Sequence, residues 1–217
     1  EVEIPAGVAR PGCVYRVRCR MQDITDRWSH WSDPVQFTAG PPLLDRPRLA
    51  LQVTEVMYHP AASVSEDGWD QDEFEFIEFM NIGPTPIDLF GVRLEGGVEF
   101  AFAGSAVTQL APGAYVLVVE NLVAFECRYG SALLSEVAGQ YEGKLANGGE
   151  DLRVVDLQTG SLADFAYDDA WYPSTDGQGQ SLVLVDPEHV DPGQLGQKAS
   201  WRASARWGGS PGARDGP

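Results

Sequence analysis

Histidine, cysteine and basic residues are scarce in this sequence, and each shortage argues against a class of function. Among 217 residues there are three histidines, three cysteines and 15 lysines and arginines, against 32 aspartates and glutamates. The resulting net charge of −17 disfavours binding to phosphate backbones and to anionic membrane surfaces. The apolar run at 114–119 is far shorter than the ~20 residues that a membrane-spanning helix needs. We therefore expect no nucleic-acid partner and no membrane insertion in this segment.

The sequence also lacks a disulfide framework and the common catalytic motifs. Cys13 and Cys19 lie six residues apart on one expected strand, about 20 Å at ~3.3 Å per residue, which is beyond disulfide reach. The glycine-rich stretch 177–179 lacks the third glycine and the following helix of a dinucleotide loop, and no P-loop motif is present. No histidine stands in a recognisable pattern with a nucleophile and an orienting carboxylate. We therefore expect no catalytic residues, no enzymatic activity and no cofactor.

What the sequence does contain is β-type periodicity with many turn residues. Glycine and proline together make up 39 of 217 residues, about 18 % against an average near 12 %. Apolar and polar residues alternate in short runs bounded by Gly, Pro, Asn and Asp, which is typical of an antiparallel sandwich or barrel. The runs predict strands at 15–21, 35–38, 50–57, 74–81, 87–89, 93–94, 98–102, 115–120, 152–156, 163–167 and 181–185. One helical turn is expected between Asn121, which can cap it, and Gly130, which can end it.

The composition changes at a proline-rich stretch, residues 41–48. Residues 1–48 hold seven arginines and six acidic residues, a net charge of +1, so the rest of the chain carries −18. Proline removes ladder donors and stiffens the chain, which is typical of a linker. We therefore expect a first part at 1–40, a linker at 41–48 and a larger domain at 49–217.

The first part combines alternating arginines with a tryptophan box. Arg16, Arg18 and Arg20 share one face of the expected strand, and Trp28 and Trp31 follow in the stretch WSHWS. These five residues predict a cation–π ladder, worth about 0.5–1 kcal/mol per exposed contact. The stretch resembles the end of a fibronectin type III domain with the WSxWS box that also occurs in cytokine receptors. Such a domain needs about seven strands, so the resemblance implies its C-terminal part only, in a chain cut from a longer protein.

The second part resembles the lamin tail domain over about residues 49–215. The matching stretches, in the family's order, are VTEVMYHP at 53–60, FIEFMN at 76–81, IDLFGVRL at 87–94, LAPGAYVLV at 110–118, LANGGEDL at 145–152, DGQGQSL at 176–182, and WRAS at 201–204 with GSPG at 209–212. The last two are similar to the end of the bacterial branch. The resemblance implies an all-β fold, an immunoglobulin-like β-sandwich. It also implies a secreted or cell-surface bacterial protein, in which such domains accompany fibronectin modules, CotH-type kinase domains or hydrolases.

An acidic segment is the candidate metal site. Residues 66–78 contain seven carboxylates and no basic residue. Ca²⁺ takes six to eight oxygen ligands, so Asp67, Asp70 and Asp72 could bind it weakly if the chain folds back at Gly68. The alternative, which we favour, is a solvated loop at 66–73 in which Trp69 is exposed.

These patterns predict a non-catalytic structural or interaction module of a larger extracellular or cell-surface bacterial protein. Its partners would be a protein, a polysaccharide or other domains of the parent chain. The alternative is a carbohydrate-binding accessory module of a secreted hydrolase or CotH-type kinase protein, because aromatic rings stack on sugars. Core packing is the competing explanation for these rings, which are Trp69, Trp171, Trp201, Tyr58, Tyr141, Tyr167 and Tyr172. A third hypothesis is an enzyme that uses two carboxyls among Asp70, Asp72 and Glu73, held about 5–10 Å apart in a cleft.

Overall fold

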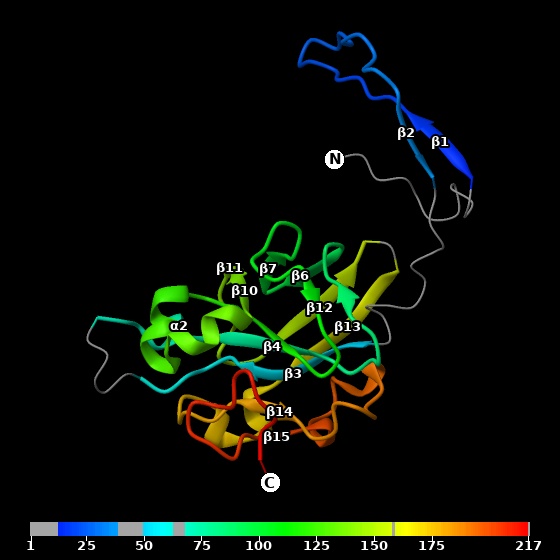
Figure 1. Cartoon of the computed structure of the whole chain (residues 1–217). Coiled ribbons are helices and arrows are strands. Elements are labelled where there is room, and N and C mark those ends of the chain that lie inside the picture. Colours follow the sequence, from blue (N-terminus) through cyan, green and yellow to red (C-terminus); the bar gives the residue numbers. More distant parts are fainter. Residues whose placement is uncertain (1–12, 39–49, 63–67, 158, 217) are drawn as a thin grey trace. The chain divides into compact units, whose positions relative to one another are not determined.

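The structure is a computed structural model that describes residues 13–38, 50–62, 68–157 and 159–216 (Figure 1). The chain divides into two compact units, Glu1–Leu44 and Asp45–Pro217. The linker expected at 41–48 lies outside the described residues. Strands predominate over helices in both units, so the chain is mainly a β protein. All three cysteines are free and exposed.

The first unit is an antiparallel hairpin of β1 (Val14–Val17) and β2 (Val35–Thr38). Tyr15 lies opposite Phe37, and the two rings stack with centroids 5.7 Å apart. β1 ends at Val17, whereas the alternation predicted a strand to residue 21. Beyond that point the backbone N–H groups of Ser29 and Ser32 still bond to carbonyls across the hairpin, at 2.8 and 2.9 Å. The hairpin therefore continues past β1 in irregular form.

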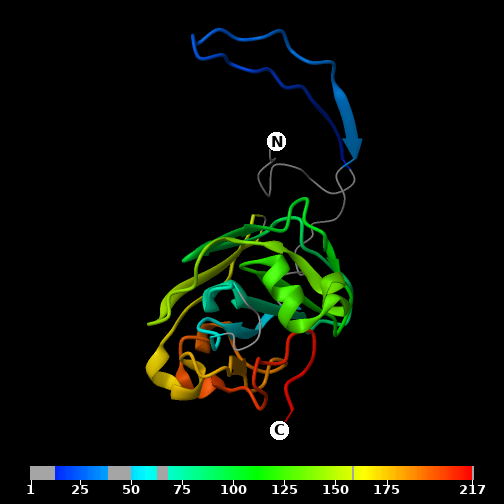
Figure 2. The same ribbon diagram turned by 90° about the vertical axis from the view of Figure 1, so that its left-hand side faces the viewer.

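Two sheets build the second unit (Figures 1 and 2). The six-stranded sheet has the order β10 (Val137–Gln140), β9 (Tyr115–Val119), β4 (Phe76–Asn81), β3 (Leu51–Met57), β14 (Leu182–Leu184) and β15 (Trp201–Ala203). The five-stranded sheet has the order β11 (Glu142–Gly143), β7 (Val98–Ala101), β6 (Val92–Gly96), β12 (Glu150–Asp156) and β13 (Gly160–Tyr167). β5 (Ile87–Asp88) and β8 (Gln109–Leu110) form a separate pair. Neighbouring strands are antiparallel except β9 and β10, which are parallel.

The main core lies between these two sheets. Ile77 and Phe79 of β4 belong to the same buried cluster as Leu152 and Val154 of β12. The ring of Phe79 meets that of Phe102 edge to face, with centroids 6.0 Å apart. Burial of such side chains from both sheets is the main stabilising term of a two-layer fold. The second unit is therefore an all-β sandwich.

The helix α2 (Leu122–Tyr129) covers the other face of the six-stranded sheet. Phe125 of α2 packs in a second buried cluster with Phe76, Leu117 and other side chains of that face. The side chain of Asn121 accepts hydrogen bonds from the N–H groups of Val123 and Ala124, at 2.9 and 3.1 Å. The predicted helical turn and its cap are thus confirmed.

Short 3-10 turns connect many of the strands. They are η1 (Gln71–Phe74), η2 (Ser131–Glu136), η3 (Asp169–Trp171), η4 (Pro173–Thr175), η5 (Pro192–Gln194) and η6 (Lys198–Ser200). Because residues 71–74 form η1, β4 begins at Phe76 and not at residue 74 as the periodicity predicted. The sequence did not predict β8, β10, β11 or β15, which are two to four residues long.

Candidate functional site

Two buried glutamates face each other on neighbouring strands of the six-stranded sheet. Glu55 of β3 stands directly opposite Glu78 of β4, and each residue is 1 % exposed. A register shift between Val53 and Glu55 makes Thr54 an extra residue on β3, as in a β-bulge. The bulge lets Thr54 lie beside the pair, and its hydroxyl donates to Oε1 of Glu78 at 2.6 Å.

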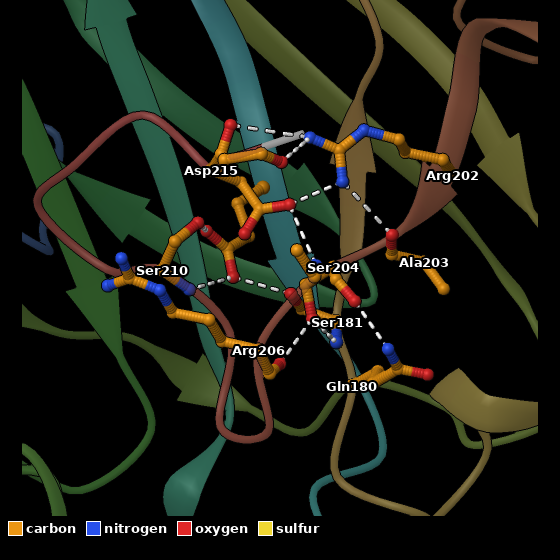
Figure 3. A network of polar contacts seen from close by, with 11 residues as sticks. Gln180, Ser181, Arg202, Ala203, Ser204, Arg206, Ser210 and Asp215 are labelled. Carbon is orange, nitrogen blue, oxygen red and sulfur yellow. Dashed lines mark hydrogen bonds and ion pairs between the residues drawn. The ribbon is translucent and has the colours of Figure 1, made fainter.

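Both carboxylates bind residues 204–215, which we name the C-terminal strap. Figure 3 shows part of this network, with Ser210 and Asp215 of the strap labelled. The N–H of Ser210 donates to Oε1 of Glu55 at 2.9 Å, and the Ser210 hydroxyl lies 2.8 Å from Oε2. The Ser181 hydroxyl lies 2.5 Å from Oε1 of the same carboxyl group. The N–H of Gly212 donates to Oε2 of Glu78 at 2.7 Å. Backbone groups of the strap are therefore held by side chains of the sheet.

The base of the strap is closed by an ion pair. Arg202 of β15 binds the carboxylate of Asp215, which also accepts the N–H of Ala205 at 2.9 Å. The N–H of Ser204 bonds to the carbonyl of Ser181 at 2.9 Å. Figure 3 shows these side chains converging at one place beside the sheet.

The burial of the two glutamates changes their acidity. Burial raises the pKa of Glu55 to about 7, although hydrogen bonds from Ser181 and Ser210 act in the opposite direction. Burial also raises the pKa of Glu78 well above its ordinary value, and the charge of Glu55 adds to this effect. The cavity beside them is about 30 Å³, the volume of about one water molecule. The pair can hold protons and accept hydrogen bonds.

A third buried glutamate, Glu75, directly precedes β4 and contacts two residues of the main core. Glu75 is 0 % exposed, and its Oε2 accepts the hydroxyl of Tyr141 at 2.8 Å and the N–H of Leu145 at 2.9 Å. Burial raises the pKa of Glu75 to about 8, and the carboxylates of Asp72 and Glu120 add to the rise. This carboxyl group fixes the segment that follows β11.

Glu75 and Glu78 were counted among the acidic residues of 66–78, but the sequence assigned no role to any of these three glutamates. Glu55 and Glu78 lie within the matching stretches VTEVM and FIEFMN, each an acidic residue among apolar ones. A carboxylate in an otherwise apolar strand is rarely left unpaired. An acidic residue in an apolar strand was therefore the available sign of a buried polar site, but it does not identify the groups that bond to the carboxylate.

His59 lies in a polar contact chain with two side chains. Its Nδ1 is 2.5 Å from Oδ1 of Asp176, and its Nε2 is 2.5 Å from the side-chain nitrogen of Gln71. Among the described residues, no hydroxyl or thiol bonds to either ring nitrogen. The carboxylate and the imidazole of a triad are thus present without a nucleophile at the second nitrogen.

The acidic segment differs from the expected loop. Asp67 lies outside the described residues, and Asp70 is exposed. Asp72 pairs with Lys144 at 3.4 Å, and Glu73 accepts the side-chain N–H of Asn121 at 3.2 Å. In the described part of the chain, no group of three or more His, Cys, Asp or Glu side chains is arranged to hold a metal ion.

Residues 71–73 were expected in an exposed loop, but they form the turn η1 together with Phe74 and are only partly exposed. Phe74 is 0 % exposed, and the guanidinium of Arg128 lies over its ring at 3.3 Å. Trp69, expected to be exposed, is only partly so. Lys144 and Asn121, from distant segments, offset the repulsion between the acidic residues. The sequence of the acidic segment alone does not reveal these partners.

In the first unit, one arginine lies against both tryptophans. The guanidinium of Arg20 is 4.1 Å from the ring centroid of Trp28 and 4.7 Å from that of Trp31. Arg16 bonds to the side chain of Gln36 at 3.2 Å instead, and in the described hairpin neither Arg16 nor Arg18 has a ring contact. The stacking is therefore one guanidinium shared by two rings and not a ladder of three.

The aromatic residues weighed as a sugar-binding surface are divided between core and surface. Four of the seven are buried in the main core, namely Tyr58, Tyr141, Tyr167 and Trp201. Trp69, Trp171 and Tyr172 are partly exposed. An open hollow of about 610 Å³ over β6 and β7 is lined mainly by polar side chains, including Arg93, Glu95 and Glu99, and by one aromatic ring, that of Phe100.

Comparisons with known proteins identify no relative of this chain. No family model, no curated protein and no solved structure matches this chain. Within the described residues, no helix has the length and apolar character needed to cross a membrane.

Proposed function

We propose that this chain is a non-catalytic structural or interaction module of a larger protein. The observation that carries the proposal is the use of its buried carboxylates. Glu55, Glu75 and Glu78 all accept hydrogen bonds from backbone N–H groups of distant segments. Carboxylates engaged in this way hold loops against a sandwich, whereas catalytic carboxylates must face a substrate.

We assign the second unit to an immunoglobulin-like sandwich of the lamin tail type and the first to the end of a fibronectin type III domain. The two-layer arrangement of the second unit supports the former assignment. The latter is supported by the WSxWS box, in which the Ser29 and Ser32 hydroxyls accept backbone N–H groups from across the hairpin, at 2.9 and 3.1 Å. A parent protein outside the cell or at its surface follows from this pairing of modules, with a protein, a polysaccharide or its own other domains as partner.

The absence of catalysis is tested by assaying the purified chain. Phosphodiester, peptide and glycoside substrates are incubated with the wild type and with the variants Glu55→Gln and Glu75→Gln. We expect no turnover above the buffer blank in any sample. Turnover by the wild type that a single substitution abolishes would overturn the proposal.

The alternative is a carbohydrate-binding module, and the hollow over β6 and β7 is the feature that favours it. Glu95, Glu99 and Arg93 can donate to or accept from sugar hydroxyls, but Phe100 is the one ring there. Sugar binding usually relies on stacking against aromatic faces, so we rank this function second. Affinity electrophoresis in polysaccharide gels distinguishes the two. Glu126, an exposed residue of α2, does not line the hollow and serves as the control. Retardation of the wild type that is lost in Glu99→Ala but kept in Glu126→Ala would favour the carbohydrate-binding function.

A further inference from the structure

The C-terminal strap is attached to the sheet by two carboxyl groups of like charge. Glu55 holds the strap at Ser210, and Glu78 holds it at Gly212. The two residues are directly opposite on antiparallel strands, where side chains come closest and like charges repel. Both are 1 % exposed, so water does not screen the repulsion.

Two of the cations near the pair already have partners. Arg202 binds Asp215, and Arg214 of the strap lies 3.7 Å from Glu188. The other charged or titratable groups around the pair are Tyr115 of β9, Glu136 of η2, and Arg206 and Asp215 of the strap. Acidic groups outnumber free cations at this place, so a proton is the natural way to neutralise the pair.

We propose that the strap is a pH-sensitive latch, closed while the Glu55–Glu78 pair holds at least one proton and open when both carboxyl groups are ionised. A single proton removes the repulsion between the two groups. It also leaves enough acceptor positions for Ser210, Gly212, Ser181 and Thr54, because a carboxyl group keeps acceptor capacity when protonated. Ionisation of both groups buries two negative charges, and opening the strap lets water reach them.

The direction of the response follows from the acidity of the pair. In the folded protein the pKa of Glu55 is raised to about 7 and that of Glu78 is raised well above its ordinary value, which is 4.5 for both groups. The closed strap is therefore fully favoured below about pH 4.5. That preference is lost as the pH rises through about 7 and above. Opening is an alkaline event and not an acid one.

Hydrogen exchange of the whole chain tests the latch. Protection of the Ser210 and Gly212 amides is measured between pH 5.5 and pH 9 and corrected for the intrinsic pH dependence of exchange. We expect protection of these amides to fall about tenfold or more, since each pH unit beyond the pKa changes the ionisation ratio tenfold. Amides of β4 and β9, inside the same sheet, should keep their protection.

Two variants each replace one carboxyl group of the pair by an amide of the same shape. In Glu78→Gln and in Glu55→Gln the second ionisation cannot occur, so the strap should stay protected up to pH 9. Either variant suffices if the other fails to fold. Glu75→Gln is the matched control, because Glu75 is equally buried but its hydrogen bonds are with Tyr141 and Leu145. The strap of this variant should open as in the wild type.

Three results would overturn the proposal. One is wild-type strap protection that does not change with pH. Another is opening at alkaline pH in both Glu55→Gln and Glu78→Gln. The third is simultaneous loss of protection in the strap, β4 and β9, which would indicate unfolding of the whole unit. None of these outcomes bears on catalysis, so the latch and the proposed function are tested separately.

Discussion

The phenol of Tyr141 donates a hydrogen bond of 2.8 Å to the carboxylate of Glu75 inside the sandwich. The N–H of Leu145 donates a second bond to the same oxygen, at 2.9 Å. Burial raises the pKa of Glu75 to about 8, whereas both bonds favour its ionised form and limit the rise. The Tyr141 hydroxyl therefore contributes most to stability when Glu75 is charged.

Replacing Tyr141 by Phe should lower the free energy of unfolding by about 1–3 kcal/mol, the cost of leaving a buried acceptor without its donor. The loss should be larger at pH 9 than at pH 6, as measured by urea denaturation. Tyr172→Phe is the control, because its hydroxyl donates to the uncharged carbonyl of Trp201 at 2.8 Å. An equal loss at both pH values in Tyr141→Phe would contradict this account.

The stability of the second unit should decline between mildly acidic and alkaline pH. Glu75 has a folded-state pKa of about 8 against 4.5 ordinarily, so its contribution is complete below about pH 4.5 and is lost as the pH rises through 8. Glu75→Gln, which cannot ionise, should flatten the decline in melting temperature between pH 6 and pH 9. Glu99→Gln, a surface change on β7, should leave the decline as it is. A wild-type melting temperature that rises between pH 6 and pH 9 would show that the predicted direction of the pH dependence is wrong.

In the first unit, Arg20 is expected to contribute more to the stability of the hairpin than Arg18 does. Arg20→Ala removes contacts with both tryptophan rings, which are worth about 0.5–1 kcal/mol each. Arg18→Ala removes an equal charge two residues earlier, and Arg18 has no ring contact in the described hairpin. Chemical shifts of the Ser29 and Ser32 amides, followed with temperature, should show the hairpin weakened in Arg20→Ala and unchanged in Arg18→Ala. Equal effects of the two changes would mean that charge matters and stacking does not.

Local features of the fold were predictable from the sequence, and long-range pairings were not. The helix after Asn121 follows from its own cap and its apolar spacing, which act within one turn. The partners of Glu55 and Glu78, in contrast, are 155 and 134 residues further along the chain. The periodic pattern of apolar residues in a strand does not indicate which distant segment its side chains contact. A two-residue strand such as β11 is also too short to display alternation.

Calcium should bind the acidic segment weakly or not at all. Asp72 is already paired with Lys144, and Glu73 with Asn121, so an ion would have to displace both contacts. Extracellular calcium modules typically bind at about 0.1–1 mM. Calorimetric titration should reveal no stoichiometric site tighter than about 10 µM. Finding such a site, and losing it in Asp70→Asn but not in Glu99→Gln, would show that the segment is a true calcium site.

Gly209 should be intolerant of any side chain because it lies against the buried carboxyl pair. Its φ is +79°, a region that costs residues other than glycine about 1–2 kcal/mol. An added Cβ would also stand 2.1 Å from Oε1 of Glu55 and 2.9 Å from Oγ of Ser181. Glu55 cannot move aside easily, since Ser181 and Ser210 hold that oxygen.

Gly104 provides a matched control for that substitution. Its φ is also +79°, but an added Cβ would have no heavy atom within 4 Å. Gly104→Ala should therefore cost the backbone strain alone, about 1–2 kcal/mol. Gly209→Ala should cost that strain and, in addition, about 1–3 kcal/mol for overpacking the site. The difference in free energy of unfolding between the two variants, measured at pH 6 where the strap is closed, isolates the contact between strap and carboxyl pair. Equal losses would mean that the strap does not pack closely on Glu55 in solution.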